Sequence, residues 1–506
     1  MIGLFGRGRP DHPMADAKSA RRILEELPPR DPVKALEELG HWHESVSQFA
    51  DFRPEARIEV LLLIDAAAED RVRKITREYL APARLSRFQE NRLWTAANGY
   101  WRRAGLALAR AVDLFVQGAK GVERARPQLP LLLVSALRAV AQQIAWAHLR
   151  YGPHDPVAWG TFNRIYGYAE AQGLAQAPVT TRSGALQGRT PQLEYLQGLM
   201  LSASAPESLL PAQLDVADKL IGRFAHHLRF GAGRSAETPF WTDLQNSMVP
   251  QRASRVLQPA PSVRFFGAGP ALAELAALRD RLRASQAPQA DLGPGVTVER
   301  EEALDLLEHL LKCWSPQAPA RRHERHAVKS RLDVANGWSG VLEALDPSAS
   351  LAFDGSGMES WVVENVSAGG FGALVAAVKG DWLRVGALIA MRPEGGSNWL
   401  VGIVRRVQKT SGSQARVGVE TQARSPEIAQ FSLGPGEAPS EIGMLLRPGA
   451  PGAAEVRIAL RPGVFAPGHN LECRDGKAQR VFLPTRIADR GEDYEIGRFR
   501  EMVRDA

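Results

Sequence analysis

The hydrophobic residues of this chain change their spacing near residue 285, and this change limits the folds that the chain can adopt. Before it, apolar residues recur three and four positions apart, as at Leu214, Ala217 and Ile221. This spacing places them on one face of an α-helix. After Arg325 the period moves toward two, which is typical of strands with one buried face. The sequence therefore predicts an α+β multidomain protein, in which an all-α N-terminal region precedes a small antiparallel β-barrel and a β-rich C-terminal tail.

Stretches rich in proline and glycine indicate where these domains begin and end. We expect a flexible N-terminus over 1–29, a helical domain of unknown role over 30–284, a linker and connecting helix over 285–318, the barrel over 319–430 and a β-rich extension over 440–506. In the linker region, Thr297 can cap a helix that Pro316 and Pro319 end.

Several short segments have the composition of strands. They are rich in branched and aromatic residues and are separated by Gly, Pro, Asn and Ser. The predicted strands are Trp361–Val363, Leu383–Met391, Trp399–Val407, Ala415–Glu420 and Glu455–Leu460, with a hairpin turn at Asp475-Gly476.

The composition is that of an ordinary globular protein, with 44% hydrophobic and 24% charged residues. No apolar run reaches the roughly 18 residues of a membrane span, and the best candidate, Leu129–His148, is interrupted by Arg138 and is expected to be a buried helix. Because the N-terminus lacks the apolar segment of a signal peptide, and because Cys313 and Cys473 fit a reducing compartment, we expect a cytoplasmic protein. The net charge of +7 is spread along the chain, so a nucleic-acid partner is not expected.

Two short motifs carry the side chains with the most specific chemistry. The first is Arg321-Arg322-His323-Glu324-Arg325, which runs into a strand, and the second is Asn365-Val366-Ser367-Ala368-Gly369-Gly370, which ends another. Arginine pairs bidentately with phosphate oxygens and with the O6 and N7 atoms of guanine. Asparagine offers a donor and an acceptor, Ser367 adds a hydroxyl, and glycines let a backbone approach a ligand closely. Together these groups suit an anionic guanine nucleotide.

The two motifs in their strand context resemble the ligand-binding segments of the PilZ domain family. The resemblance covers roughly residues 319–425 and implies a bacterial receptor for the second messenger cyclic di-GMP. It also implies that Arg321 and Arg325 clamp the ligand and that Asn365, Ser367 and Gly370 line the barrel surface, with Arg322 and Gly369 as further candidates. No cofactor besides this ligand is implied, and the family suggests a role in motility, biofilm or exopolysaccharide control through a protein partner that the sequence does not reveal.

The chain departs from one type of PilZ protein. In the flagellar-brake type the N-terminal partner domain is β-rich, whereas here it is predicted to be helical. The Arg-x-x-x-Arg pattern alone is also weak, because it recurs at Arg73/Arg77, Arg279/Arg283 and Arg500/Arg504, where solvated helix faces are expected.

Three other interpretations of the sequence stay open. His309, His323 and His326 could bind a metal ion, although the arginines around two of them favour a positively charged surface. Trp94, Tyr100 and Trp101 could line a pocket, but packed core aromatics are the simpler expectation. The chain lacks a nucleophile elbow and a phosphate loop, so we expect no enzyme activity and no metal. A third alternative is a structural adaptor whose barrel no longer binds nucleotide.

The position of the arginine motif suggests how binding could be transmitted. The motif lies between the connecting helix and the barrel, and we expect it to be mobile until a dianion draws it onto the barrel. Residues 285–297 would then act as a flexible linker that allows the helical domain to rearrange.

Overall fold

The chain forms two compact units. The computed structural model describes residues 10–81, 85–180, 188–253, 260–284, 292, 296, 298–318, 320, 323–346, 358–410, 413–434, 440–447, 455–475 and 478–505. The first unit comprises residues 1–150, 154–206 and 211–319, and the second comprises 151–153, 207–210 and 320–506. The architecture is α+β, as the sequence predicts, with a helical region followed by a closed antiparallel barrel and a second β-rich sheet.

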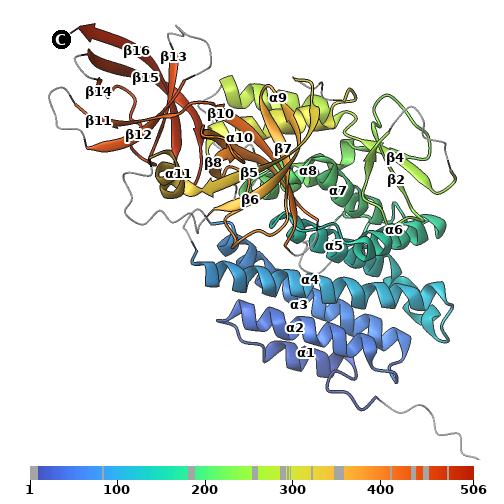
Figure 1. Cartoon of the computed structure of the whole chain (residues 1–506). Coiled ribbons are helices and arrows are strands. Elements are labelled where there is room, and N and C mark those ends of the chain that lie inside the picture. Colours follow the sequence, from blue (N-terminus) through green and yellow to red (C-terminus); the bar gives the residue numbers. More distant parts are fainter. Residues whose placement is uncertain are drawn as a thin grey trace, which may run out of the picture. The chain divides into compact units, whose positions relative to one another are not determined.

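The first unit is built mainly from helices. Long helices lie side by side at its N-terminal end, where α2, α3 and α4 contact one another (Figure 1). The α-helices are α1 (Ala17–Glu25), α2 (Pro32–Gln48), α3 (Pro54–Tyr79), α4 (Arg87–Val116), α5 (Leu129–His148), α6 (Pro156–Ala171), α7 (Pro191–Ala203), α8 (Pro211–Phe224), α9 (Ala271–Ala284) and α10 (Arg300–Trp314). Short 3-10 helices are η1 (Val122–Gln128) and η3 (Ala225–His227), and η2 (Pro206–Ser208) spans the boundary between the two units in the sequence.

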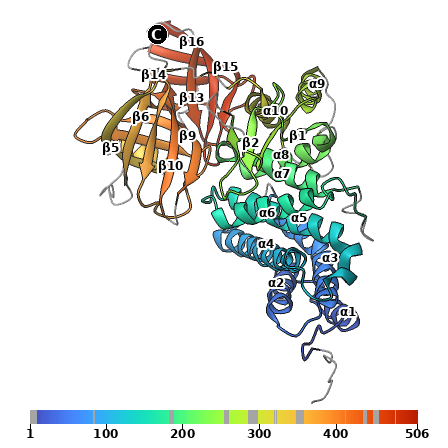
Figure 2. The ribbon, with the colours of Figure 1, turned by 90° about the vertical axis from the view of Figure 1, so that its right-hand side faces the viewer.

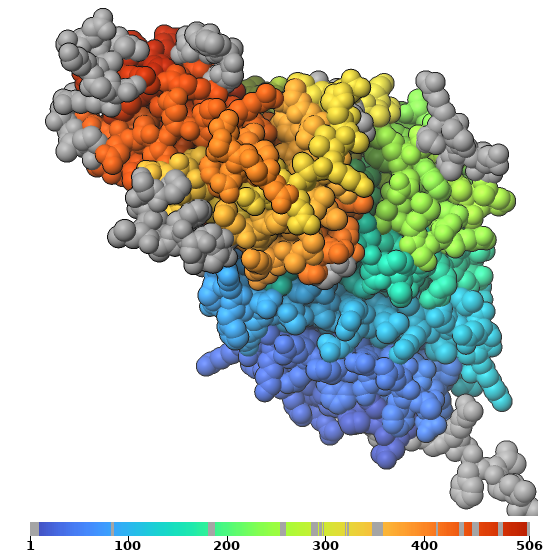
Figure 3. Space-filling view, in the orientation of Figure 1, coloured from blue at the N-terminus to red at the C-terminus, as the bar shows by residue number. Residues whose placement is uncertain are grey.

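Side-chain caps begin several of these helices. Asp31, Asp155 and Thr190 each accept a backbone N–H of the first turn and are followed by proline. Ser86 opens α4 with a capping box completed by Gln89. In the space-filling view the side chains of the first helices, in blue, form a continuous surface (Figure 3).

Helix α5 is a long and strongly apolar helix. Among the described residues, the stretch Val122–His148 is long and apolar enough to cross a membrane, but 67% of its apolar window is buried inside the structure. It contacts α4, α6 and α7. The expectation of a buried helix at Leu129–His148 is therefore confirmed.

The helical region also contains a small sheet that the sequence did not predict. Its antiparallel strands are ordered β1-β4-β2-β3, with bounds β1 (Arg229–Gly231), β2 (Phe240–Asp243), β3 (Gln251–Arg252) and β4 (Val263–Gly267). The region is thus helical with a sheet inserted before α9, rather than all-α.

The second unit begins with a closed barrel of six antiparallel strands in the order β10-β7-β6-β5-β8-β9 (Figure 2). Its elements are β5 (His326–Asn336), α11 (Gly337–Leu345), β6 (Glu359–Ser367), β7 (Gly370–Val375), β8 (Leu388–Pro393), β9 (Leu400–Lys409) and β10 (Ala415–Ala423). The predicted strand at Leu383–Met391 begins only at Leu388. Gly386 has a φ of +83° and interrupts the extended backbone before it.

A buried carboxylate fixes one part of the barrel. Trp361 and Trp382 stack with ring centroids 6.0 Å apart, and the indole N–H of each donates to Glu359. Glu359 also accepts the backbone N–H of Lys379 at 3.0 Å. This carboxylate is buried but has three donors, so its desolvation is offset.

The C-terminal strands form a sheet ordered β11-β12-β13-β16-β15-β14 that nearly closes on itself through a bridge between Ser432 and Glu472. The strands are β11 (Glu427–Phe431), β12 (Glu441–Leu446), β13 (Glu455–Leu460), β14 (Leu471–Asp475), β15 (Ala478–Arg490) and β16 (Glu495–Asp505). Strands β14 and β15 pair on either side of the predicted turn, whose Gly476 lies outside the described residues.

Candidate ligand-binding site on the barrel

The structure brings the two sequence motifs onto neighbouring strands. Arg325 directly precedes β5, where His326 pairs with Val366 and Ala327 pairs with Asn365 of β6. Arg325 is exposed and makes no hydrogen bond or ion pair with the described residues. Segments 40 residues apart in sequence therefore meet at one end of a strand pair. Arg321 and Arg322 lie outside the described residues.

The second motif forms a tight hairpin. Ser367 of β6 pairs with Gly370 of β7, and Ala368-Gly369 make the turn between them. The Ser367 hydroxyl donates to the carbonyl oxygen of Gly370 at 3.1 Å, which leaves its lone pairs able to accept another hydrogen bond. A side chain at Gly370 would overlap the Val419 carbonyl, so only glycine fits there. Of the two glycines, Gly370 has positive φ and Gly369 does not.

Asn365 holds an unsatisfied acceptor beside this hairpin. Its Oδ1 atom is buried and has no hydrogen-bond partner in the described structure. The carboxamide lies across Gly372 of β7, because a Cβ atom there would be 2.8 Å from Nδ2 and 3.1 Å from Oδ1. Leaving such an atom unpaired costs about 1–3 kcal/mol. A ligand that supplies an N–H group would recover this free energy.

The strand pairing is irregular around Asn365. The register shifts between Val363 and Asn365 in the β6–β7 pair, and between Ala327 and Ser330 in the β5–β6 pair. Bulges re-aim side chains and are frequent beside binding sites. The irregular strand pairing therefore lies where we expect a binding site on the barrel surface.

His323 links the arginine segment to the hairpin. Its Cδ2 atom lies 3.1 Å from the place that a Cβ on Gly369 would take, so the imidazole rests against this bare turn. The arm that carries Arg325 therefore contacts the second motif directly. The sequence places His323 on a positively charged surface but does not reveal this contact.

The hypothesis of a metal-binding site gains no support from the described residues. The described residues contain no group of three or more side chains able to hold a metal ion. His309 lies in α10 with its Nε2 atom 2.8 Å from the carbonyl oxygen of Ser204, in the first unit. His323 and His326 are exposed residues at the start of the barrel.

The aromatic cluster of α4 is part of the helical core. Tyr100 and Trp101 are buried and pack edge to face with ring centroids 5.0 Å apart. Trp94 donates its indole N–H to the Trp146 carbonyl at 2.9 Å. These contacts confirm the expectation of core aromatics.

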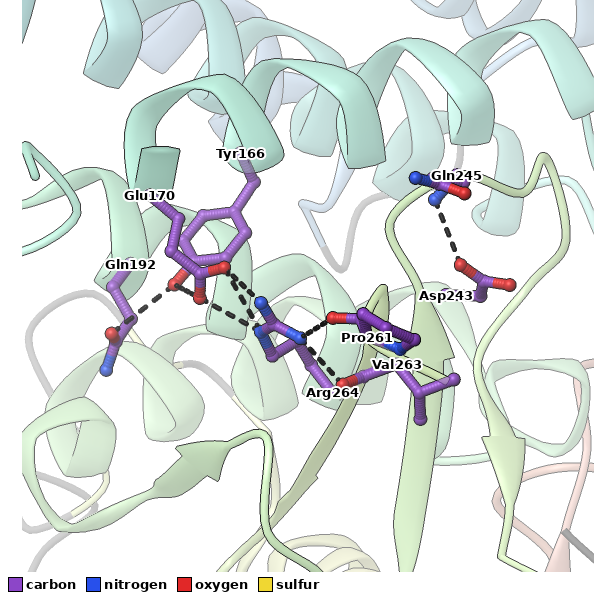
Figure 4. Close-up of polar contacts among 8 residues, drawn as sticks. All are labelled: Tyr166, Glu170, Gln192, Asp243, Gln245, Pro261, Val263 and Arg264. Atoms are coloured by element: carbon purple, nitrogen blue, oxygen red, sulfur yellow. Dashed lines mark hydrogen bonds and ion pairs between the residues drawn. The ribbon is translucent and has the colours of Figure 1, made fainter. Parts of the chain in front are cut away.

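A polar cluster in the helical unit is saturated by its own contacts (Figure 4). The Arg264 guanidinium donates to both carboxylate oxygens of Glu170 and to the carbonyls of Pro261 and Val263. Tyr166 points at the same carboxylate, 3.5 Å away. Since all three nitrogens of the Arg264 guanidinium already donate to acceptors within the protein, this cluster clamps β4 to α6 and is a poor ligand site.

A cavity of about 690 Å³ in the helical unit is another place where an anion could lie. Its walls include Arg234, Arg252 and Pro316. The Arg252 guanidinium already donates to the carbonyls of Cys313 and Ser315, at 2.7 and 3.0 Å, and so ends α10. Its charge therefore serves the helix terminus.

Comparison with known families finds a similarity in the helical region. Residues 18–235 match the family described as cyclic-di-GMP receptor FimW, N-terminal domain. The helical region is thus similar to the N-terminal domain of a cyclic di-GMP receptor. The match ends before the barrel, and a search of curated proteins found no match. Sequence reasoning could not name this region, because amphipathic helices alone do not distinguish one helical family from another.

Proposed function

We propose that this protein is a cyclic di-GMP receptor of the PilZ type, with its ligand site where the arginine arm meets the β6–β7 hairpin. The observation that carries the proposal is the pairing of Ala327 with Asn365, which sets Arg325 beside the hairpin. The similarity of residues 18–235 to the N-terminal domain of a cyclic di-GMP receptor supports the same ligand from an independent part of the chain.

Each residue has a role that follows from its chemistry. Arg321 and Arg325 clamp phosphate and guanine, and Arg322 adds a cation. The unpaired Oδ1 of Asn365 accepts a guanine N–H, which relieves the buried acceptor. Ser367 accepts through its remaining lone pairs, and Gly369 and Gly370 hold the turn close to the ligand.

The wider role is that of a cytoplasmic effector rather than an enzyme. Ligand binding draws the arm onto the barrel and biases the helical unit, which acts on a protein partner in motility, biofilm or exopolysaccharide control. Its measurable consequence is a ligand-dependent change in amide exchange outside the barrel. The competing function, a structural adaptor with a barrel that binds no nucleotide, predicts no change anywhere.

Calorimetric titration of the full chain with cyclic di-GMP tests the site. Arg325→Ala removes charge-assisted hydrogen bonds and should weaken binding by about tenfold or more. Asn365→Ala should weaken it by a similar factor, since the guanine N–H loses its acceptor. Arg77→Ala is the matched control, because Arg77 is an exposed arginine of α3 in the same sequence pattern. Binding by both site variants that equals that of the wild type would refute the site.

A further inference from the structure

Four residues form a row across neighbouring strands of the barrel. Asn365 of β6 pairs with Gly372 of β7, Gly372 pairs with Gly418 of β10, and Gly418 pairs with Arg406 of β9. Directly paired residues of an antiparallel sheet lie on the same face. Three strand spacings separate the ends of the row, which is a span of about 14 Å.

This row lies on the outer face of the barrel. Ala373, Val417 and Val419, which flank the two glycines, are buried in the barrel core. Because side chains alternate along a strand, Gly372 and Gly418 face outward. The barrel surface beside Asn365 is therefore a strip of bare backbone.

The backbone does not require glycine at either position. Neither Gly372 nor Gly418 has positive φ. Glycine inside a strand weakens it, and it marks places where a ligand or another chain comes close to the backbone. At Gly372 the absent side chain already makes room for the Asn365 carboxamide. At Gly418 the one described atom within 4 Å of an added Cβ is the Cβ of Arg406, 3.3 Å away, so no described side chain fills that space as the Asn365 carboxamide does at Gly372.

The ends of the strip carry polar groups that suit a nucleotide. Asn365 supplies the unpaired acceptor at one end. At the other end Arg406 is exposed and forms an ion pair with Glu207 at 3.1 Å, within the same unit. A phosphate can replace that carboxylate, because both match the arginine fork.

We propose that Gly372 and Gly418 form a shelf on which the cyclic dinucleotide lies, with Arg406 as the cation at its far end. This inference rests on the proposed function and extends its site from the hairpin across β7 and β10. A flat purine can stack on bare peptide backbone, and the span of the row matches a ligand with two bases and two phosphates. Any side chain at Gly418 would lift the ligand away from Asn365.

A graded series at Gly418 tests the shelf. Gly418→Ala should weaken cyclic di-GMP binding a few-fold and Gly418→Val by about tenfold or more, since each added group separates ligand and backbone. The melting temperature of Gly418→Ala should stay close to that of the wild type, because alanine favours strands over glycine and the 3.3 Å contact with the Arg406 Cβ needs only a small adjustment. Ser360→Val is the control, since Ser360 is an exposed residue of β6 at the opposite end of the strand from the hairpin. It should bind like the wild type.

The outcomes separate this inference from the proposed function. If the wild type binds cyclic di-GMP and Gly418→Val binds within about twofold of it, the shelf is wrong and the hairpin site stands. If Gly418→Val melts early, the Gly418→Ala variant decides, because one methyl group leaves the strand intact. Failure of the wild type to bind would overturn the proposed function itself.

Discussion

Two buried side chains with polar atoms that lack hydrogen-bond partners in the described structure, Asn365 and His43, have different consequences for this protein. The buried Oδ1 atom of Asn365 lies beside the β6–β7 hairpin, which carries the proposed ligand site. His43 of α2 is fully buried, and both of its ring nitrogens lack partners in the described structure. Burial lowers the pKa of His43 to about 3, so the imidazole stays neutral. The first group is suited to binding, whereas the second is a cost to stability.

Replacing His43 should therefore stabilise the helical unit. His43→Leu removes the unpaired nitrogens and should add about 1–3 kcal/mol to the free energy of unfolding at pH 7.5. Because the unfolded histidine binds a proton below pH 6.5 and the folded one does not, His43 also destabilises the fold by about 2 kcal/mol at pH 5. The variant should then lose less stability between pH 7.5 and pH 5 than the wild type.

Melting curves at the two pH values measure this difference. His41→Leu provides the control, since His41 is an exposed residue on the same helix. An identical pH dependence for His43→Leu and the wild type would mean that His43 is not buried as a neutral group. His148, whose pKa burial also lowers to about 3, would retain its own share of the acid sensitivity.

The sequence names the candidate site residues but does not reveal their surroundings. Asn365, Ser367 and Gly370 follow from a local pattern. The contact of His323 with Gly369 and the row that includes Gly418 depend on which strands pair and in what register. Register is set by the whole barrel, so no local pattern contains it. Glycines inside the segments Gly370–Val375 and Ala415–Ala423 were the one available clue.

At the scale of elements, helices were predictable and the small sheet was not. The helical period is local, and α8, α9 and α10 appear where their apolar residues recur. The strands of the small sheet have two to five residues each, which is too short for alternation to be recognised. Their position is fixed by long-range contacts such as that between Arg264 and Glu170.

Breaking that contact should loosen the sheet from α6. Glu170→Ala leaves the mostly buried Arg264 guanidinium without its carboxylate, at a cost of about 1–3 kcal/mol. Thermal unfolding should shift several degrees lower. Glu237→Ala is the matched control in the same region, because Glu237 forms an exposed ion pair with Arg229 that should contribute under about 1 kcal/mol. Equal effects of the two substitutions would contradict the clamp.

At the scale of the whole molecule, the predicted segments pack together in groups that differ from those expected from the sequence. Helix α10 was expected to connect two domains, but it packs against α8 and α9 inside the helical unit. The C-terminal sheet was expected to be an extension, yet Met444, Tyr494 and Ile496 share a core with α11 and the barrel. The composition shows where the chain changes from one type of secondary structure to another. Which segments share a hydrophobic core is seen only in the folded structure. The flexible linker that we expect at residues 285–297 lies mostly outside the described residues.

Hydrogen exchange on the full chain, with and without cyclic di-GMP, tests the central claim most directly. It asks which unit holds the ligand, since the family match concerns residues 18–235 while the proposed site is on the barrel. The account predicts slower amide exchange in β5 and in the β6–β7 hairpin, together with a change in amide exchange in the helical unit. Protection confined to the helical unit, such as around Arg234 and Arg252, would contradict it.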